Sequence, residues 1–243
     1  MPTALILGAT SDIGIALSRK FAMEGFDIQL AARKIEDLPP LRSDLMIRYN
    51  VHCTIYRFDA VDIAQHNPFF LSLSPVPDVT IFVIGYMHDE NAAKKNWAET
   101  EKILYANYVG AVSILNLTAE HYATRQKGII VGISSVAGER GRQSNYLYGS
   151  AKAGLSAYLS GLRNSLFPFQ VHVLTVKPGF VYTRMTENLK LPALLTATPQ
   201  EVAKAVFIGV KNKKNVIYVK SIWRLIMFVI KCIPEFLFKK LKL

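Results

Sequence analysis

Cysteine, acidic residues and long uninterrupted hydrophobic runs are all scarce in this chain of 243 residues. Its two cysteines, Cys53 and Cys232, lie far apart and match no metal-binding spacing, so we expect a reduced, cytoplasmic protein without a metal. The N-terminus has no basic stretch and leads directly into a strand-like segment, which argues against a signal peptide. Near the C-terminus the longest uncharged run covers residues 225–230. That is far shorter than the roughly twenty residues that span a bilayer.

Acidic side chains number 18 against 29 Lys and Arg, which gives a net charge of +11. This balance favours anionic partners such as nucleotides, phosphorylated lipids or membrane surfaces. A well-solvated surface is the plainer alternative, because charge alone does not choose among these. The sequence contains no nucleic-acid-binding motif, so we expect no nucleic-acid partner. The apolar fraction of 51% is too high for a disordered chain.

Strand-like and helix-like segments alternate along the chain. Short runs rich in Ile and Val predict strands at residues 4–7, 27–32, 54–58, 79–84, 128–134, 171–177 and 216–219. Longer periodic stretches predict helices that include residues 13–24, 97–123, 148–166 and 199–211. This alternation predicts an α/β protein: a single-domain Rossmann fold with a doubly wound parallel sheet of about seven strands over residues 1–221. A separate C-terminal helix is expected over residues 222–243.

A glycine-containing turn, residues 8–14 with the sequence GATSDIG, joins the first strand to the first helix. Free amides and the helix dipole favour an anion at a helix N-terminus, and glycine lets the backbone approach a pyrophosphate. A turn of this kind is weak support by itself, because many strand–helix turns bind nothing. Its place before an alternating chain favours cofactor contacts from Gly8, Thr10, Ser11, Asp12, Ile13 and Gly14.

Other candidate residues follow the predicted strands at their carboxyl ends, where doubly wound sheets bind ligands. They are Arg33, Asp59, Ala60, Gly85, Pro178 and Gly179. Their shared edge predicts one dinucleotide site. Ala32 stands where NAD-dependent enzymes usually place an acid, and Arg33 could bind a 2′-phosphate, so NADP(H) is preferred and NAD(H) is the alternative. Asp59 either meets the adenine or caps the next turn.

Three further residues carry the chemistry. Tyr148 and Lys152 are four residues apart, so on a helix they share a face. An ammonium beside a phenol lowers the phenol pKa from its usual value of about 10, which would let Tyr148 exchange a proton with a substrate oxygen near neutral pH. The Ser135 hydroxyl, thirteen residues earlier, can hydrogen-bond the same oxygen. Together they suit the interconversion of a ketone and an alcohol. A half-buried tyrosine and a solvated lysine are the alternative.

These motifs together resemble the short-chain dehydrogenase/reductase family over residues 3–219. The resemblance implies hydride transfer with NAD(P)H, catalytic roles for Ser135, Tyr148 and Lys152, and contact of Tyr148 and Lys152 with the nicotinamide ribose. It also implies that the turn over residues 178–183, with Val181 and Thr183, lies beside the nicotinamide. It also implies that Asn107 bonds a main-chain carbonyl and holds a water that leads to the lysine. The helix over residues 149–166 would join a symmetry mate in a homodimer or homotetramer.

The chain departs from the family pattern at two places. Asp12 stands where the family usually has a third glycine, so we expect its side chain to turn away from the phosphates or to cap the helix. The Asn-Asn-Ala-Gly after the fourth strand is Phe-Val-Ile-Gly here, and only Gly85 remains. A nucleotide-binding protein without catalysis therefore stays an alternative.

A narrower resemblance comes from residues 137–142, 178–185 and 223–227. These segments are similar to decaprenylphosphoryl-ribose 2′-epimerase reductase subunits. That similarity implies reduction of a keto-sugar carried on a polyprenyl phosphate, in cell envelope biosynthesis, with a partner oxidase that makes the ketone. The alternative is a cytosolic reductase of a small ketone.

The C-terminal segment is apolar but interrupted by Arg224 and Lys231, and Lys239, Lys240 and Lys242 follow it. This composition predicts a basic amphipathic helix that lies in a lipid interface, so the protein would be peripheral at the inner face of the membrane. Packing of this helix on its own domain or on a partner subunit is the alternative.

Overall fold

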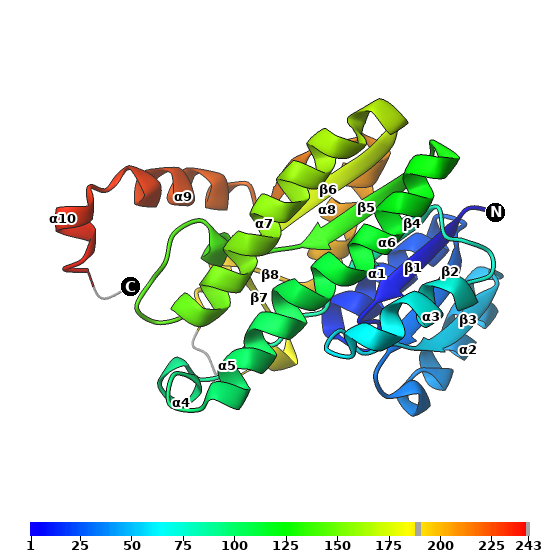
Figure 1. The fold of residues 1–243 in the computed structure, drawn as a ribbon, viewed down its shortest axis with the longest axis horizontal. Coiled ribbons are helices and arrows are strands. Elements are labelled where there is room, and N and C mark those ends of the chain that lie inside the picture. Colours follow the sequence, from blue (N-terminus) through cyan, green and yellow to red (C-terminus); the bar gives the residue numbers. More distant parts are fainter. Residues whose placement is uncertain (188–190, 242–243) are drawn as a thin grey trace.

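The computed structural model describes residues 1–187 and 191–241 of the chain. Seven parallel strands form its central sheet in the order β3-β2-β1-β4-β5-β6-β9 (Figure 1). They are β1 (Thr3–Leu7), β2 (Asp27–Ala32), β3 (Cys53–Arg57), β4 (Val79–Phe82), β5 (Gly128–Ile133), β6 (Val171–Pro178) and β9 (Val216–Val219). A two-stranded ribbon adds β7 (Phe180–Val181) and β8 (Thr196–Ala197). The predicted single-domain α/β fold with a parallel sheet of seven strands is confirmed.

Helices cover both faces of the sheet because side chains of a strand alternate between its two faces. In β1, Ala4 and Ile6 pack in the core with α1 (Asp12–Met23), α2 (Pro39–Tyr49) and α8 (Pro199–Lys211). Leu5 and Leu7 pack in the opposite core with α3 (His66–Ser72), α6 (Gly110–Arg125) and α7 (Tyr146–Leu166). The chain leaves β1 toward β2 on one side and β4 lies on the other, so the strand order reverses beside β1, which is where such sheets bind ligands.

The long helix predicted over residues 97–123 is divided in the structure. It consists of α5 (Trp97–Leu104), a π-helical turn (Tyr105–Val109) and α6. Such turns insert an extra residue into a helix and often occur at functional sites. Asn107 lies in this turn. The short helix α4 (Glu90–Ala93) precedes α5.

Helices α2 and α3, like the short α4, were not expected from the sequence. Pro39 and Pro40 begin α2, and Pro68 stands in the first turn of α3. Proline is a helix breaker elsewhere, but it is tolerated in a first turn, where its missing N–H would have no helical partner.

The C-terminal segment forms α9 (Ile222–Cys232) and α10 (Glu235–Phe238), which project beyond one end of the sheet (Figure 1). Trp223 and Met227 of α9 are buried against Val136. The predicted packing on the chain's own domain is therefore present on one face of α9. Lys242, predicted as part of the basic tail, lies outside the described residues. Within residues 1–187 and 191–241, no helix combines the length and apolarity that crossing a bilayer needs.

Candidate functional site

The turn between β1 and α1 has the shape that an anion site requires. Ser11 is the N-cap of α1: its Oγ accepts a hydrogen bond from the Gly14 amide at 3.0 Å and donates one to the Gly8 carbonyl at 2.8 Å. Gly8 has a φ of +104°, and a Cβ on Gly14 would lie 2.3 Å from the Gly8 oxygen, so both positions need glycine. The compact turn leaves the N-terminus of α1 facing the ligand edge of the sheet.

Asp12 is held by an arginine that the sequence did not point to. The Arg184 amide donates to Asp12 Oδ2 at 2.8 Å, and the Arg184 guanidinium pairs with Oδ1 at 3.3 Å. The same guanidinium donates to the Thr10 carbonyl. The expectation that Asp12 caps the helix is wrong, because Ser11 is the N-cap; the Asp12 carboxylate instead links α1 to the loop after β7. Arg184 also compensates the negative charge that Asp12 places beside the glycine turn.

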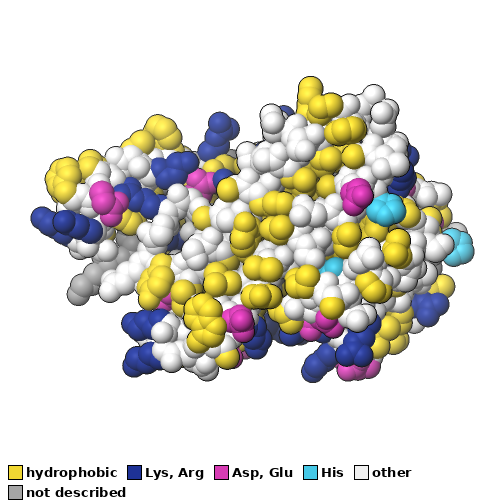
Figure 2. Space-filling model, viewed as in Figure 1, with side chains coloured by type: hydrophobic (Ala, Val, Ile, Leu, Met, Phe, Trp, Pro, Cys, Tyr) yellow, Lys and Arg dark blue, Asp and Glu magenta, His cyan; other side chains and the backbone are white. Residues whose placement is uncertain are grey.

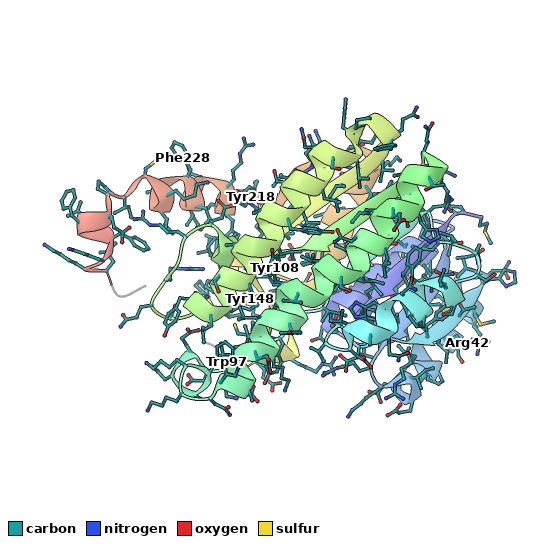
Figure 3. All side chains as sticks on the ribbon, in the orientation of Figure 1. Arg42, Trp97, Tyr108, Tyr148, Tyr218 and Phe228 are labelled. Atoms are coloured by element: carbon teal, nitrogen blue, oxygen red, sulfur yellow. The ribbon has the colours of Figure 1, made fainter. Side chains whose placement is uncertain are left out.

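A cavity of about 340 Å³ lies at the carboxyl edge of the sheet, and it brings most of the predicted residues together. Those that line it are Ser11, Asp12, Ile13, Gly85, Ser135, Tyr148, Lys152, Pro178, Gly179, Val181 and Thr183. Tyr148 comes from the N-terminal part of α7 (Figure 3). The sequence did not indicate six further lining residues, namely Val83, Ile133, Ser134, Arg184, Met185 and Thr186.

The electrostatics of Tyr148 and Lys152 differ from the prediction. Burial raises the pKa of Tyr148 to about 12, and interaction with Ser135 lowers it only in part. Burial also lowers the pKa of Lys152 to about 7. The Lys152 ammonium donates to the Ile133 carbonyl at 3.0 Å and lies 5.7 Å from the centre of the Tyr148 ring. The predicted lowering of the tyrosine pKa is therefore wrong in this structure, because loss of hydration outweighs the hydrogen bond with Ser135.

Asn107 fixes the segment that follows β4. Its Nδ2 donates to the carbonyls of Ile103 at 2.8 Å and Tyr86 at 2.6 Å, and its Oδ1 accepts from the Tyr86 amide at 3.3 Å. The main-chain bond expected of this asparagine is present. Asn107 also supplies hydrogen bonds to the stretch at Gly85 that lacks the family's two asparagines.

Seven predicted residues do not line the cavity, namely Gly8, Thr10, Gly14, Asn107, Arg33, Asp59 and Ala60. Of these, Arg33, Asp59 and Ala60 lie farther along the sheet edge. Arg33 is exposed directly after β2. Asp59 accepts from the Val61 amide at 3.2 Å, so it caps the next turn, as the alternative assignment had it. The Ala60 carbonyl packs closely on Gly110: a Cβ added to Gly110 would lie 2.0 Å from the Ala60 oxygen.

The apolar stripe on α7 mainly serves this chain's own core. Leu155 and Leu159 are fully buried there, while Tyr158 and Leu162 are partly buried. The Tyr158 hydroxyl donates to Asn116 Oδ1 at 2.7 Å. The stripe therefore gives no direct sign of a symmetry mate, and the homo-oligomer stays a prediction.

Comparison with known proteins agrees with this geometry. A profile described as short chain dehydrogenase matches residues 2–193. An uncharacterized oxidoreductase from Mycobacterium tuberculosis is 35% identical over 98% of this chain and 96% of its own. An uncharacterized oxidoreductase from Streptomyces coelicolor is 32% identical over 98% of this chain and 94% of its own.

Solved structures share the fold. A short-chain dehydrogenase from Sphingobium yanoikuyae in complex with NADPH superposes with a TM-score of 0.82 at 22% identity, over 97% of each chain. A bulky-bulky ketone specific alcohol dehydrogenase from Comamonas testosteroni gives 0.80 at 24% identity, over 97% of this chain and 96% of its own.

Proposed function

Because this chain belongs to the short-chain dehydrogenase family, we propose that it uses NAD(P)H to interconvert a ketone and a secondary alcohol. The observation that carries the proposal is the common cavity of Ser135, Tyr148 and Lys152, which opens beside the glycine turn. These three side chains come from two elements and meet at one sheet edge, which a purely structural role would not require.

The residues present fit a dinucleotide. The N-terminus of α1 and the turn from Gly8 to Gly14 would hold the pyrophosphate, where a Cβ on Gly14 would close the turn. Tyr148 and Lys152 would hold the nicotinamide ribose, with the Pro178–Gly179 turn beside the ring. When bound, the reduced cofactor supplies the hydride.

Tyr148 supplies the proton. With a pKa raised to about 12, its hydroxyl is protonated at neutral pH and can donate to the carbonyl oxygen as negative charge develops there. The Ser135 hydroxyl holds the same oxygen by a hydrogen bond. Lys152, whose pKa is lowered to about 7, can carry a charge that stabilises the resulting phenolate. Asn107 keeps the wall at Gly85 in place.

The Tyr148→Phe variant tests this assignment. Loss of the proton donor should lower turnover by about 10²–10⁴-fold while cofactor binding, measured by fluorescence titration, stays near that of the wild type. Tyr146→Phe, at an exposed tyrosine of the same helix, is the control and should keep full activity. Wild-type turnover in Tyr148→Phe would refute the assignment. If neither wild type nor control oxidises cofactor with any ketone offered, the non-catalytic alternative is favoured.

We propose that NADPH is the preferred cofactor. Ala32 leaves the end of β2 without an acid, and exposed Arg33 is free to approach a 2′-phosphate with a paired, charged hydrogen bond. Arg33→Ala should raise the KM for NADPH about tenfold or more and leave the KM for NADH nearly unchanged, because a charged hydrogen bond contributes about 1.5–3 kcal/mol. Lys34→Ala, at the neighbouring exposed cation, is the control. Equal effects on both cofactors would contradict the preference.

For the substrate, we propose a keto-sugar carried on a polyprenyl phosphate, made by a partner oxidase, with the protein at the cytoplasmic face of the membrane. The segment at residues 137–142 and the net charge of +11 support an anionic, lipid-linked substrate. Reconstitution with an oxidase and a polyprenyl-phosphate pentose should give NADPH-dependent reduction. Faster turnover of small soluble ketones would favour the alternative, a cytosolic ketone reductase.

A further inference from the structure

Helix α9 has two apolar faces with different surroundings. Its inner face packs on the domain through Trp223 and Met227. Its outer face presents Leu225, Phe228 and Val229, whose side chains are 64%, 64% and 55% exposed. Helical geometry places these three on one side of α9, opposite the buried pair. A soluble monomer rarely exposes so contiguous a row of large apolar residues.

The exposed apolar surface continues into the next helix. Phe236 and Leu237 of α10 are 62% and 46% exposed, and Leu241 follows them at 45%. Apolar and basic side chains are interleaved over this projecting end of the molecule (Figure 2). We call the outer residues Leu225, Phe228, Val229, Phe236 and Leu237 the tail face.

Cations border the tail face. Arg224 and Lys231 lie along one edge of α9, where Lys231 pairs with Glu139 at 2.9 Å, and exposed Lys239 and Lys240 follow α10. The segment from residue 222 to 232 contains no acid, and the next acid, Glu235, is paired with Arg140 at 2.8 Å. An apolar row bordered by cations matches the interface of an anionic bilayer, where acyl chains lie beneath negative headgroups.

A hollow of about 400 Å³ is present on this surface. Its lining combines Arg224 and Lys231 with Leu225, Phe228 and Tyr218. Because Lys231 already pairs with Glu139, Arg224 is the cation of this hollow that suits a lipid phosphate whose acyl chains lie against Leu225 and Phe228. Helix α9 has eleven residues, so its length is roughly 16 Å and it can only lie along a bilayer, not cross it.

The tail face is also fixed relative to the catalytic cavity. The Arg140 guanidinium donates to the carbonyls of Ile230 and Ile233, both at 2.6 Å, and lies 3.7 Å from the centre of the Phe238 ring. Trp223 packs directly on Gly179 in the cavity wall. A Cβ added to Gly179 would lie 1.9 Å from the indole nitrogen of Trp223. Helix α9 also starts just after the carboxyl end of β9, at the same sheet edge as the cavity.

We propose that the tail face docks on an anionic phospholipid bilayer and holds the cavity edge of the sheet beside the lipid headgroups. Binding combines burial of the apolar row with attraction between the cations and the headgroups. The inference concerns lipid binding itself, so it does not depend on which ketone the enzyme reduces.

The test is sedimentation of the full chain with vesicles of phosphatidylcholine alone or mixed with phosphatidylglycerol. Wild type should sediment with the mixed vesicles, more weakly with phosphatidylcholine alone, and less as salt is raised. The double variant Leu225→Glu/Phe228→Glu should bind mixed vesicles at least tenfold more weakly. The control, Met46→Glu/Ile47→Glu, adds the same charge at exposed apolar residues of α2 and should bind like wild type.

Folding and the alternative occupant are checked in the same samples. Unchanged circular dichroism and cofactor binding of the double variant show that the fold is intact; if it unfolds, Lys239→Glu/Lys240→Glu replaces it and should likewise lose most binding. No sedimentation of wild type with mixed vesicles would overturn the proposal. So would equal binding by wild type and a folded tail variant. A dimer that the double variant dissociates, without vesicle binding by wild type, would identify a second copy as the occupant instead.

Discussion

At the scale of single residues, burial sets the protonation of Tyr148 and Lys152. Both lie on one face of α7 and line the same cavity, where loss of hydration raises the pKa of the phenol and lowers that of the ammonium. The direction of the tyrosine pKa depends on burial and on where the ammonium points, and neither follows from spacing. The Asp12–Arg184 pair was equally out of reach, because its partners are 172 residues apart in the chain.

Lys152 gives a pH-dependent prediction. Its pKa falls from 10.5 in the unfolded chain to about 7 in the folded one, so the unfolded chain binds more protons between these values. The energetic cost of burying the ammonium is therefore complete below pH 7 and disappears as the pH rises toward 10.5. Lys152→Met should abolish most turnover. It should nevertheless raise the free energy of unfolding by about 1–3 kcal/mol at pH 6, because removal of the buried charge outweighs loss of the hydrogen bond to Ile133.

Thermal unfolding at pH 6 and pH 10 measures this difference. The stabilisation should shrink at the higher pH. Lys204→Met, at an exposed lysine of α8, is the control and should show no such dependence. A Lys152→Met variant that is less stable than wild type at pH 6 would contradict the claim that burial of the Lys152 ammonium destabilises the fold.

At the scale of elements, strands and amphipathic helices were predictable from hydrophobic periodicity. The turns that interrupt a helix were not. The bounds of β2, α8 and β9 match the expected residues. The π-helical turn that carries Asn107 has no periodic signature, since its extra residue shows only in the hydrogen bonds. The loop after β5 was also unpredictable: Glu139 lies there and binds Lys177, Lys231 and the Tyr218 hydroxyl.

Glu139 should stabilise the attachment of α9. Burial alone would raise the pKa of Glu139, but hydrogen bonds from Lys177 and Lys231 outweigh burial and lower it to about 2. A carboxylate whose folded pKa is lowered contributes stability above its unfolded pKa of 4.5, and loses it as the pH falls toward 2. Glu139→Gln should therefore cost about 1–3 kcal/mol at pH 7.

The loss of unfolding free energy in Glu139→Gln should diminish below pH 4.5, because there the Glu139 carboxylate of the wild type stabilises the fold less. Denaturant titration at pH 7 and pH 3 checks it, with Glu36→Gln at an exposed position as the control. Equal stability of wild type and Glu139→Gln at pH 7 would show that the three contacts contribute nothing net.

At the scale of the whole molecule, alternation of strands and helices was enough to predict the sheet, since each parallel strand needs a crossover helix. Assembly was not predictable, because the α7 stripe is buried within the chain. Large apolar side chains such as Trp97 and Tyr105 are nonetheless exposed on and beside α5. We expect a homodimer or homotetramer, which light scattering would show as two or four times 27.2 kDa. A mass of one chain at micromolar concentration would contradict it.

The contact between Trp223 and Gly179 makes intrinsic tryptophan fluorescence a probe of the cavity. The chain has only two tryptophans, and Trp97 is largely exposed whereas Trp223 is buried behind Gly179 of the cavity wall. Replacing Trp97 by phenylalanine would leave one indole as the emitter. Its emission would then report both the arrival of a ligand at the Pro178–Gly179 turn and any displacement of α9, without an added dye.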